Sequence, residues 1–256
     1  MTSPIGRLAA PVFALSLLLP AAASAQSFTP DQRSEIEKIV REYLISHPEV
    51  LQDVIAEMDK RQASEEAEKQ HAAVSENQAQ IFNSTHQVTI GNAKGDVTMV
   101  EFFDYNCAFC KRALSDMLDL MKTDAKLRVV LKEFPVLGEG SKQAAQVAVA
   151  ARMQDKSGGK KYLEFHQKLL GGRGQADKAR ALAVAKEVGF DMGRLEKDMA
   201  SEEVNTTIEE NFKLAEAMGL NGTPSYVIGS DVLVGAVGLD ALREKLNISR
   251  CGKATC

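Results

Sequence analysis

The sequence predicts an α/β fold in which a strand–helix–strand unit is followed by a helical insert, a hairpin and a closing helix. Residues 97–103 and 127–134 are near-continuous apolar runs of strand length, a pattern typical of strands that are covered on both faces. Between them, residues 107–122 carry leucines and methionines at helical spacing, which predicts a helix. This order indicates parallel strands that are joined by a right-handed crossover.

The second half of the chain supplies the insert and the remaining strands. Residues 141–218 have a helical pattern that is interrupted at the glycine-containing stretches 157–159 and 171–174. Two short apolar runs within 226–234 flank a Gly-Ser-Asp turn, which predicts a hairpin. Residues 239–246 are expected to form the closing helix.

The N-terminus is arranged like a secretory signal peptide, predicted here as residues 1–25. Arg7 precedes an apolar run of 12 residues, 8–19, and small residues follow as far as Ala23-Ser24-Ala25. A short membrane anchor is disfavoured, because a helix needs roughly 20 apolar residues to cross a bilayer. We expect cleavage after Ala25 and export to a compartment where disulfides persist.

Charge and cysteine content narrow the function. The formal net charge is −4 and no basic patch stands out along the sequence, so nucleic acid is not an expected partner. The four cysteines are Cys107, Cys110, Cys251 and Cys256, too few for a disulfide-built scaffold in a domain of this size. They therefore indicate redox chemistry in the first place, and a stabilising structural disulfide only in the second.

Residues 26–86 are predicted to form a mostly helical segment ahead of the main domain, residues 87–250. Two apolar stripes are separated by a helix start at Pro48, and after Met58 the sequence turns polar and predicts a solvated helix or linker. The stripes need a partner, which is either the main domain or other copies of the chain. The stripes consist of Ile36, Val40, Tyr43 and Leu44, then Val50, Leu51, Val54, Ile55 and Met58.

The motif Cys107-Ala108-Phe109-Cys110 directly follows a predicted strand and opens a helix. Unpaired N–H groups and the helix dipole at a helix N-terminus stabilise an anion, so the Cys107 thiol is expected to ionise easily and to attack disulfides. Cys110 lies within one turn and is positioned to resolve the resulting mixed disulfide. The alternatives are a structural bridge and half of a zinc site. Zinc needs two further ligands, and none follows at a suitable spacing, so no metal site is predicted.

Two further positions carry candidate chemistry. Glu101 lies within the apolar strand 97–103, where a carboxylate is costly unless it is neutral or paired. A raised pKa would let it exchange a proton with Cys110, whereas the alternative is a solvated carboxylate at a sheet edge. Thr223-Pro224 precedes the hairpin, and from the residues alone a trans bond is the default.

The stretch Glu101–Lys111, followed by Gly222-Thr223-Pro224-Ser225, resembles the DsbA-like family of thioredoxin-fold proteins. The resemblance covers roughly residues 90–248. It is specific, because the strand, the CxxC pair, the helical insert and the Thr-Pro dipeptide follow one another in the family's order. Tyr43-Leu44, with His47-Pro48-Glu49-Val50-Leu51 after it, is similar to the ScsC-type branch, which is linked to copper-stress tolerance.

The resemblance implies a thioredoxin fold with an inserted helical subdomain and a periplasmic thiol–disulfide oxidoreductase without a cofactor. It implies a nucleophilic Cys107 that forms a disulfide with Cys110, a buried Glu101, and a cis Pro224 facing the cysteine pair. Thr223, with Ala108 and Phe109, would contact protein substrates that carry cysteines. In this branch the N-terminal helices can trimerise, here through residues 28–60, which suits disulfide isomerase activity. A membrane thiol reductase would then keep the pair reduced.

Two departures from the family pattern affect this expectation. The dipeptide Ala108-Phe109 lacks the histidine that strongly oxidising members place before the second cysteine, so a weaker oxidant is expected. The tail, residues 251–256, adds Cys251 and Cys256, which form either a local staple or a second redox pair that relays electrons to Cys107. Beside an oligomeric isomerase or reductase, a monomeric dithiol oxidase and a copper-stress thiol-binding protein remain alternatives.

Overall fold

The computed structural model describes residues 28–256, so the predicted leader and its cleavage after Ala25 lie outside the described residues. The chain divides between Met58 and Asp59 into two compact units, and each is described by itself. In the described part of the chain, no helix combines the length and apolar character needed to cross a membrane.

The first unit contains α1 (Pro30–Ser46) and the beginning of α2 (Pro48–Glu76). Thr29 and Gln32 form a capping box at the start of α1, in which each side chain satisfies a backbone N–H of the other residue. No residue of α1 is buried. Large apolar side chains are therefore exposed on both helices: Ile36, Ile39, Val40, Tyr43, Ile45, Leu51, Val54, Ile55 and Met58.

The second unit is built on a five-stranded sheet with the order β1-β3-β2-β4-β5. Strands β2 and β3 are parallel, and every other neighbouring pair is antiparallel. The edge strand β1 was not predicted, because only four residues form it and Gly91 ends it. The strands are β1 (Val88–Gly91), β2 (Val97–Phe103), β3 (Leu127–Glu133), β4 (Ser225–Ile228) and β5 (Asp231–Val234).

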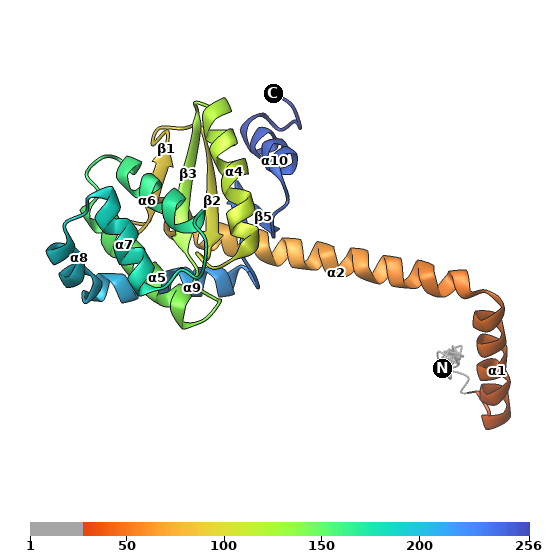
Figure 1. The fold of residues 1–256 in the computed structure, drawn as a ribbon. Helices are drawn as coiled ribbons and strands as arrows, with labels where there is room; N and C mark the ends of the chain where they lie inside the picture. The colour runs from red at the N-terminus through yellow and green to blue at the C-terminus, as the bar shows by residue number, and fades with distance from the viewer. Residues whose placement is uncertain (1–27) are drawn as a thin grey trace, which may run out of the picture. The chain divides into compact units, whose positions relative to one another are not determined.

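The helices follow the predicted order, and the predicted thioredoxin fold with a helical insert is confirmed. Helix α4 connects β2 to β3, and α10 lies beside α4 in Figure 1. The insert occupies the chain between β3 and β4. These helices are α4 (Ala108–Thr123), α5 (Glu139–Gln154), α6 (Lys160–Leu170), α7 (Lys178–Val188), α8 (Met192–Met199), α9 (Glu202–Ala217) and α10 (Leu239–Cys251).

Strand β2 separates two apolar cores because its side chains alternate between the faces of the sheet. Met99 and Phe103 belong to the larger core, which includes α4, α10 and most of the insert. Val100 and Phe102 belong to the smaller core on the other face, together with α9. Glu101 shares the face of Met99 and Phe103, which directs its carboxyl towards the core beneath α4.

The end of α2 and α3 (Gln78–Asn83) complete the smaller core. Ala73, Val74 and Ile81 are buried there, and the buried Lys132 donates from Nζ to the carbonyl oxygen of Gln80 at 2.9 Å. The unit boundary therefore falls at 58/59 and not at the predicted 86/87. Only a few apolar side chains of residues 59–86 pack against the sheet. The mostly polar composition of this segment therefore did not predict that its end belongs to the second unit.

We expect Ile81→Ala to lower the free energy of unfolding by about 2–5 kcal/mol, because it removes buried methyl groups and leaves a cavity. Ile81 has 0% exposure. Urea titration of the mature protein measures the loss. Leu137→Ala, at a side chain that is 50% exposed, is the control and should change the free energy by about 0.5 kcal/mol or less. Equal losses in the two variants would contradict the packing of α3 against the sheet.

Candidate active site

Cys107 is the N-cap residue of α4, and Cys110 lies in the first turn of this helix. The Sγ atom of Cys107 accepts the backbone N–H of Cys110 at 3.4 Å. Both cysteines are free thiols, so the disulfide predicted between them is not formed here. The structure describes the dithiol state of the pair, in which a sulfur atom takes the place of the usual capping oxygen.

The cis Thr223–Pro224 bond lies beside this pair. In its thiol form, Cys107 donates from Sγ to the carbonyl oxygen of Thr223 at 3.1 Å. The loop reaches this position because β4 pairs with β2, with Ser225 opposite Phe102 near the end of β2. Topology thus brings together two motifs that are more than a hundred residues apart in the sequence.

Hydrogen bonds lower the pKa of Cys107 to about 5, against burial, which raises it. The thiol of Cys110 is the largest cause, followed among the lowering contributions by the side chain of Thr223 and backbone N–H groups of the first turn. The bond to Cys107 and burial raise the pKa of the Cys110 thiol. The two sulfurs therefore differ strongly in acidity, as expected for one attacking and one resolving thiol.

Glu101 is 2% exposed in the central strand β2. Burial, followed by the negative charges of Cys107 and Asp116, raises its pKa to about 8. The charge of Glu101 in turn contributes to the raised pKa of Cys110. The carboxyl and both sulfurs therefore form one electrostatically coupled group, and the alternative of a solvated edge carboxylate is wrong.

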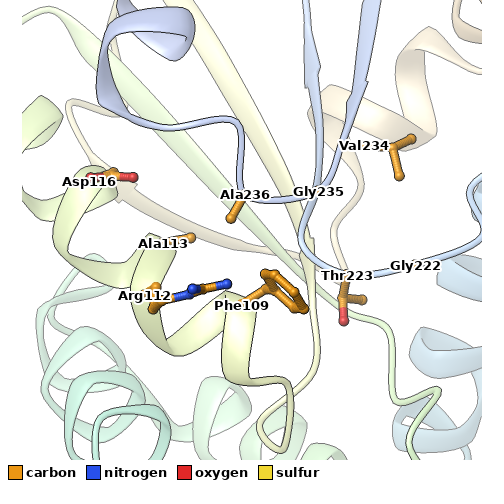
Figure 2. Close-up of a pocket in the computed structure, with 9 residues that line it drawn as sticks. All are labelled: Phe109, Arg112, Ala113, Asp116, Gly222, Thr223, Val234, Gly235 and Ala236. Carbon is orange, nitrogen blue, oxygen red and sulfur yellow. The ribbon is translucent and has the colours of Figure 1, made fainter.

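A groove of about 470 Å³ opens beside the CxxC pair (Figure 2). The ring of Phe109 is 53% exposed, and the guanidinium of Arg112 lies over it at 4.4 Å from the ring centroid. One wall comes from the start of α4, and the other comes from the cis-proline loop and the end of β5. The lining residues are Phe109, Arg112, Ala113, Asp116, Gly222, Thr223, Val234, Gly235 and Ala236.

A buried polar network fixes the turn that precedes Cys107. The Asp104 carboxylate accepts the backbone N–H of Asn106 at 2.7 Å and that of Leu137 at 2.9 Å. It also accepts the hydroxyl of Ser141 at 2.7 Å. These bonds connect the active-site turn to the loop after β3 and to α5, so the insert holds the cysteine pair in place.

The tail cysteines lie far from this site. Cys251 and Cys256 form a disulfide, and the neighbouring Arg250 pairs with Asp96 at 2.8 Å and with Asp124 at 2.7 Å. Asp124 ends α4 and Asp96 precedes β2, whereas Cys107 lies at the opposite end of both elements. With about 1.5 Å of rise per helical residue, the length of α4 separates the two pairs. A direct relay within one chain is therefore not possible.

Sequence reasoning missed three parts of the site. Arg112 could have been recognised as part of the site, because it lies three residues after Phe109 on a predicted helix and side chains at this spacing are neighbours on the helix surface. Asn106 and residues 234–236 gave no comparable signal. Their roles depend on contacts with the loop before α7 and with α4, which are remote in the sequence.

Residues 98–247 match the DSBA-like thioredoxin domain family. Residues 32–65 match the Copper resistance protein ScsC N-terminal domain. The first match covers the central strands, the CxxC pair and the cis-proline loop. The second covers most of α1 and the first part of α2.

Similar proteins of known structure and sequence agree with these matches. A thioredoxin-like oxidoreductase from Silicibacter pomeroyi DSS-3 is 41% identical over 68% of this chain and 98% of its own, with a TM-score of 0.64. Proteus mirabilis ScsC in a transitional conformation is 26% identical over 88% of this chain and 98% of its own, with a TM-score of 0.64. The thiol:disulfide interchange protein DsbA of Bordetella pertussis is 24% identical over 62% of this chain and 76% of its own.

The chain also matches Na(+)/H(+) antiporters of Salinispora and Herminiimonas at 24–26% identity, but it spans only 23–26% of their length. The family match extends over more than half of this chain, and the sheet, the cysteine pair and the cis-proline loop all lie within it. The chain therefore belongs to the DSBA-like thioredoxin domain family, with a ScsC-type N-terminal domain ahead of the catalytic fold.

Proposed function

We propose that this protein is a periplasmic thiol–disulfide interchange protein that acts as an oligomeric disulfide isomerase and reductase. The observation that carries the proposal is the placement of Cys107, whose acidic thiol lies at the start of α4 and against the cis Thr223–Pro224 loop. A thiolate at this position is the form that attacks disulfides.

The reaction begins when the Cys107 thiolate attacks one sulfur of a substrate disulfide. A bond from Cys107 to this sulfur forms, the substrate S–S bond breaks, and the other substrate sulfur leaves as a thiolate. In isomerisation, that thiolate attacks another disulfide of the substrate and frees a different substrate thiolate. This second thiolate attacks the substrate sulfur bound to Cys107, a new substrate S–S bond forms, and Cys107 leaves as a thiolate. In reduction, Cys110 attacks Cys107, the Cys107–Cys110 disulfide forms, and the reduced substrate leaves.

Glu101 supplies the proton transfer that resolution needs. The Cys107 thiolate is one cause of the raised pKa of Glu101, and this charge disappears when Cys107 bonds to a substrate. The carboxyl then loses its proton more easily, and its carboxylate accepts the proton of Cys110. Glu101 is thus a proton carrier whose acidity follows the state of Cys107.

The groove beside the pair suits an extended substrate segment. Thr223 presents backbone next to Cys107, and the exposed Phe109 offers an apolar surface next to it. Ala108 is exposed at the start of α4, so a small side chain covers the approach to Cys107, which is itself 6% exposed. The protein substrates are therefore chains with an accessible cysteine or disulfide.

Self-association through residues 28–60 supports the isomerase over a monomeric oxidase. The apolar side chains of α1 and early α2 are exposed within a single chain, and such contiguous surfaces mark interaction sites. We infer a homo-trimer, which would present several cysteine pairs to one substrate. A membrane thiol reductase would keep these pairs reduced.

The proposal predicts that the mature protein reactivates a scrambled multi-disulfide substrate, and that Ile39→Asp with Ile55→Asp abolishes this activity. These side chains are 64% and 58% exposed, so charges there should prevent association without unfolding the single chain. Sedimentation should show a change from trimer to monomer. Oxidation of a reduced substrate by the disulfide form should persist in the variant.

Ser34→Asp with Gln52→Asp is the matched control, because it adds the same two charges at exposed polar positions of α1 and α2 and should remain trimeric and active. Isomerase activity in the monomeric variant would contradict the role of the N-terminal helices. Activity that survives Cys107→Ser would instead favour the copper-stress thiol-binding role.

Glu101→Gln should change both stability and rate. The carboxyl has a pKa of about 8 when folded, against an ordinary 4.5. Its stabilising contribution is therefore complete below pH 4.5 and is lost as the pH rises through 8, at up to about 1.4 kcal/mol per pH unit. Since glutamine stays neutral, urea titrations should show the stability of the variant relative to the parent rising across this interval.

The same substitution should slow resolution of the mixed disulfide by about 10²-fold, because glutamine cannot accept the proton of Cys110. Glu101→Asp keeps a carboxyl and should recover part of the rate. A pH-independent stability difference together with an unchanged rate would show that Glu101 is solvated and not involved.

A further inference from the structure

Two side chains that flank the CxxC pair hold a glycine-rich loop of the insert beside it. Asn106 donates from Nδ2 to the carbonyl oxygen of Ala176 at 2.8 Å, and its Oδ1 accepts the N–H of Ala176 at 2.7 Å. Lys111 donates from Nζ to the carbonyl oxygen of Gly172 at 3.2 Å. The loop, residues 171–176, joins α6 to α7 and is therefore fixed on both sides of the reactive cysteines.

The glycines of this loop make room for a second cation. A Cβ atom added at Gly172 would lie 1.8 Å from Nη2 of Arg180, and one at Gly174 would lie 3.3 Å from Nη1. The guanidinium of Arg180 therefore packs directly against the loop backbone. Arg173 lies between the two glycines and is exposed.

Four cations thus lie on the first turns of α4 or on and against the loop clamped beside it, and we refer to them as the cationic rim: Lys111, Arg112, Arg173 and Arg180. None of them forms an ion pair with a carboxylate among residues 28–256. The whole chain has a net charge of −4, so the rim opposes the overall charge. Two of its members come from α4 and two from the insert, which explains why the sequence alone gave no sign of a basic patch.

The carboxylates near the cationic rim do not neutralise its positive charge, because each has another partner or position. The Oδ1 atom of Asp177 accepts the backbone N–H of Arg180 at 2.9 Å and caps α7. Glu139 is bonded to Gln143 at 3.2 Å. Asp116 lines the groove further along α4 (Figure 2), where burial and neighbouring acids raise its pKa.

We propose that the cationic rim receives an acidic polypeptide segment that flanks the target cysteine of a substrate protein. This inference rests on the proposed function, because the rim serves substrate choice only if Cys107 attacks that cysteine. Lys111 and Arg112 follow Cys107 by four and five residues on α4, and the loop that carries Arg173 is hydrogen-bonded to Asn106 and Lys111, which flank the pair. Aspartate or glutamate near a bound cysteine would therefore come within a Debye length, about 8 Å at physiological salt, of several cations. Such complementarity raises association rates and disfavours partners of the wrong charge.

The test uses three short peptides, each with one cysteine in a mixed disulfide with an aromatic thiol. The flanking residues are glutamate, glutamine or lysine. The Cys107 thiolate of the reduced mature protein attacks the peptide sulfur, and the aromatic thiolate leaves and is measured. At about 0.01 M salt we expect the acidic peptide to react at least tenfold faster than the basic one, with the ratio approaching one at about 1 M salt.

Arg173→Glu should lower the rate with the acidic peptide and raise the rate with the basic one, whereas a misfolded protein would lose both. Lys94→Glu makes the same charge change at an exposed residue in the turn before β2, remote from Cys107, and should leave all three rates unchanged. Equal rates for acidic and basic peptides, with the neutral peptide reacting normally, would overturn the rim alone. An unreactive neutral peptide would overturn the proposed function together with it.

Discussion

The acidity of Cys107 is the property on which the rest of the structure depends. The sulfur occupies the N-cap of α4, and hydrogen bonds with the Cys110 thiol, the side chain of Thr223 and backbone N–H groups of the first turn lower its pKa. Parallel pairing of β2 with β3 places α4, and antiparallel pairing of β4 with β2 places the cis-proline loop. The sheet therefore creates the site by bringing a helix start and a loop to one sulfur atom.

Burial acts in opposite directions on the groups of this site. It raises the pKa of Glu101 and, together with the bond to Cys107, that of Cys110. At Cys107 it is outweighed by hydrogen bonds. Near neutral pH, Cys107 is therefore a thiolate while Glu101 is a neutral carboxylic acid. When Cys107 bonds to a substrate its charge disappears, and Glu101 can then become negatively charged. This coupling gives attack and resolution their order.

The sequence predicted the parts of this account that depend on local pattern. Apolar runs gave β2 and β3, helical spacing gave α4, and the position of Cys107 at a helix start gave its chemistry. Contacts between distant segments were not predictable, as the packing of Ile81, the stacking of Arg112 and the clamp of Asn106 illustrate. The distance between the two cysteine pairs could not be predicted either. It arises because Cys107 and Cys110 lie at the start of α4, whereas the tail that carries Cys251 and Cys256 is held near the end of α4.

The thiolate absorbance of the reduced mature protein as a function of pH tests the central claim most directly. We predict a midpoint near pH 5 that is absent in Cys107→Ser. In Cys110→Ala the midpoint should move upward, because the thiol of Cys110 is the largest cause of the lowered pKa. A midpoint near the ordinary value of 9.0 in the parent protein would contradict the account, since Cys107 would then be mostly protonated at neutral pH.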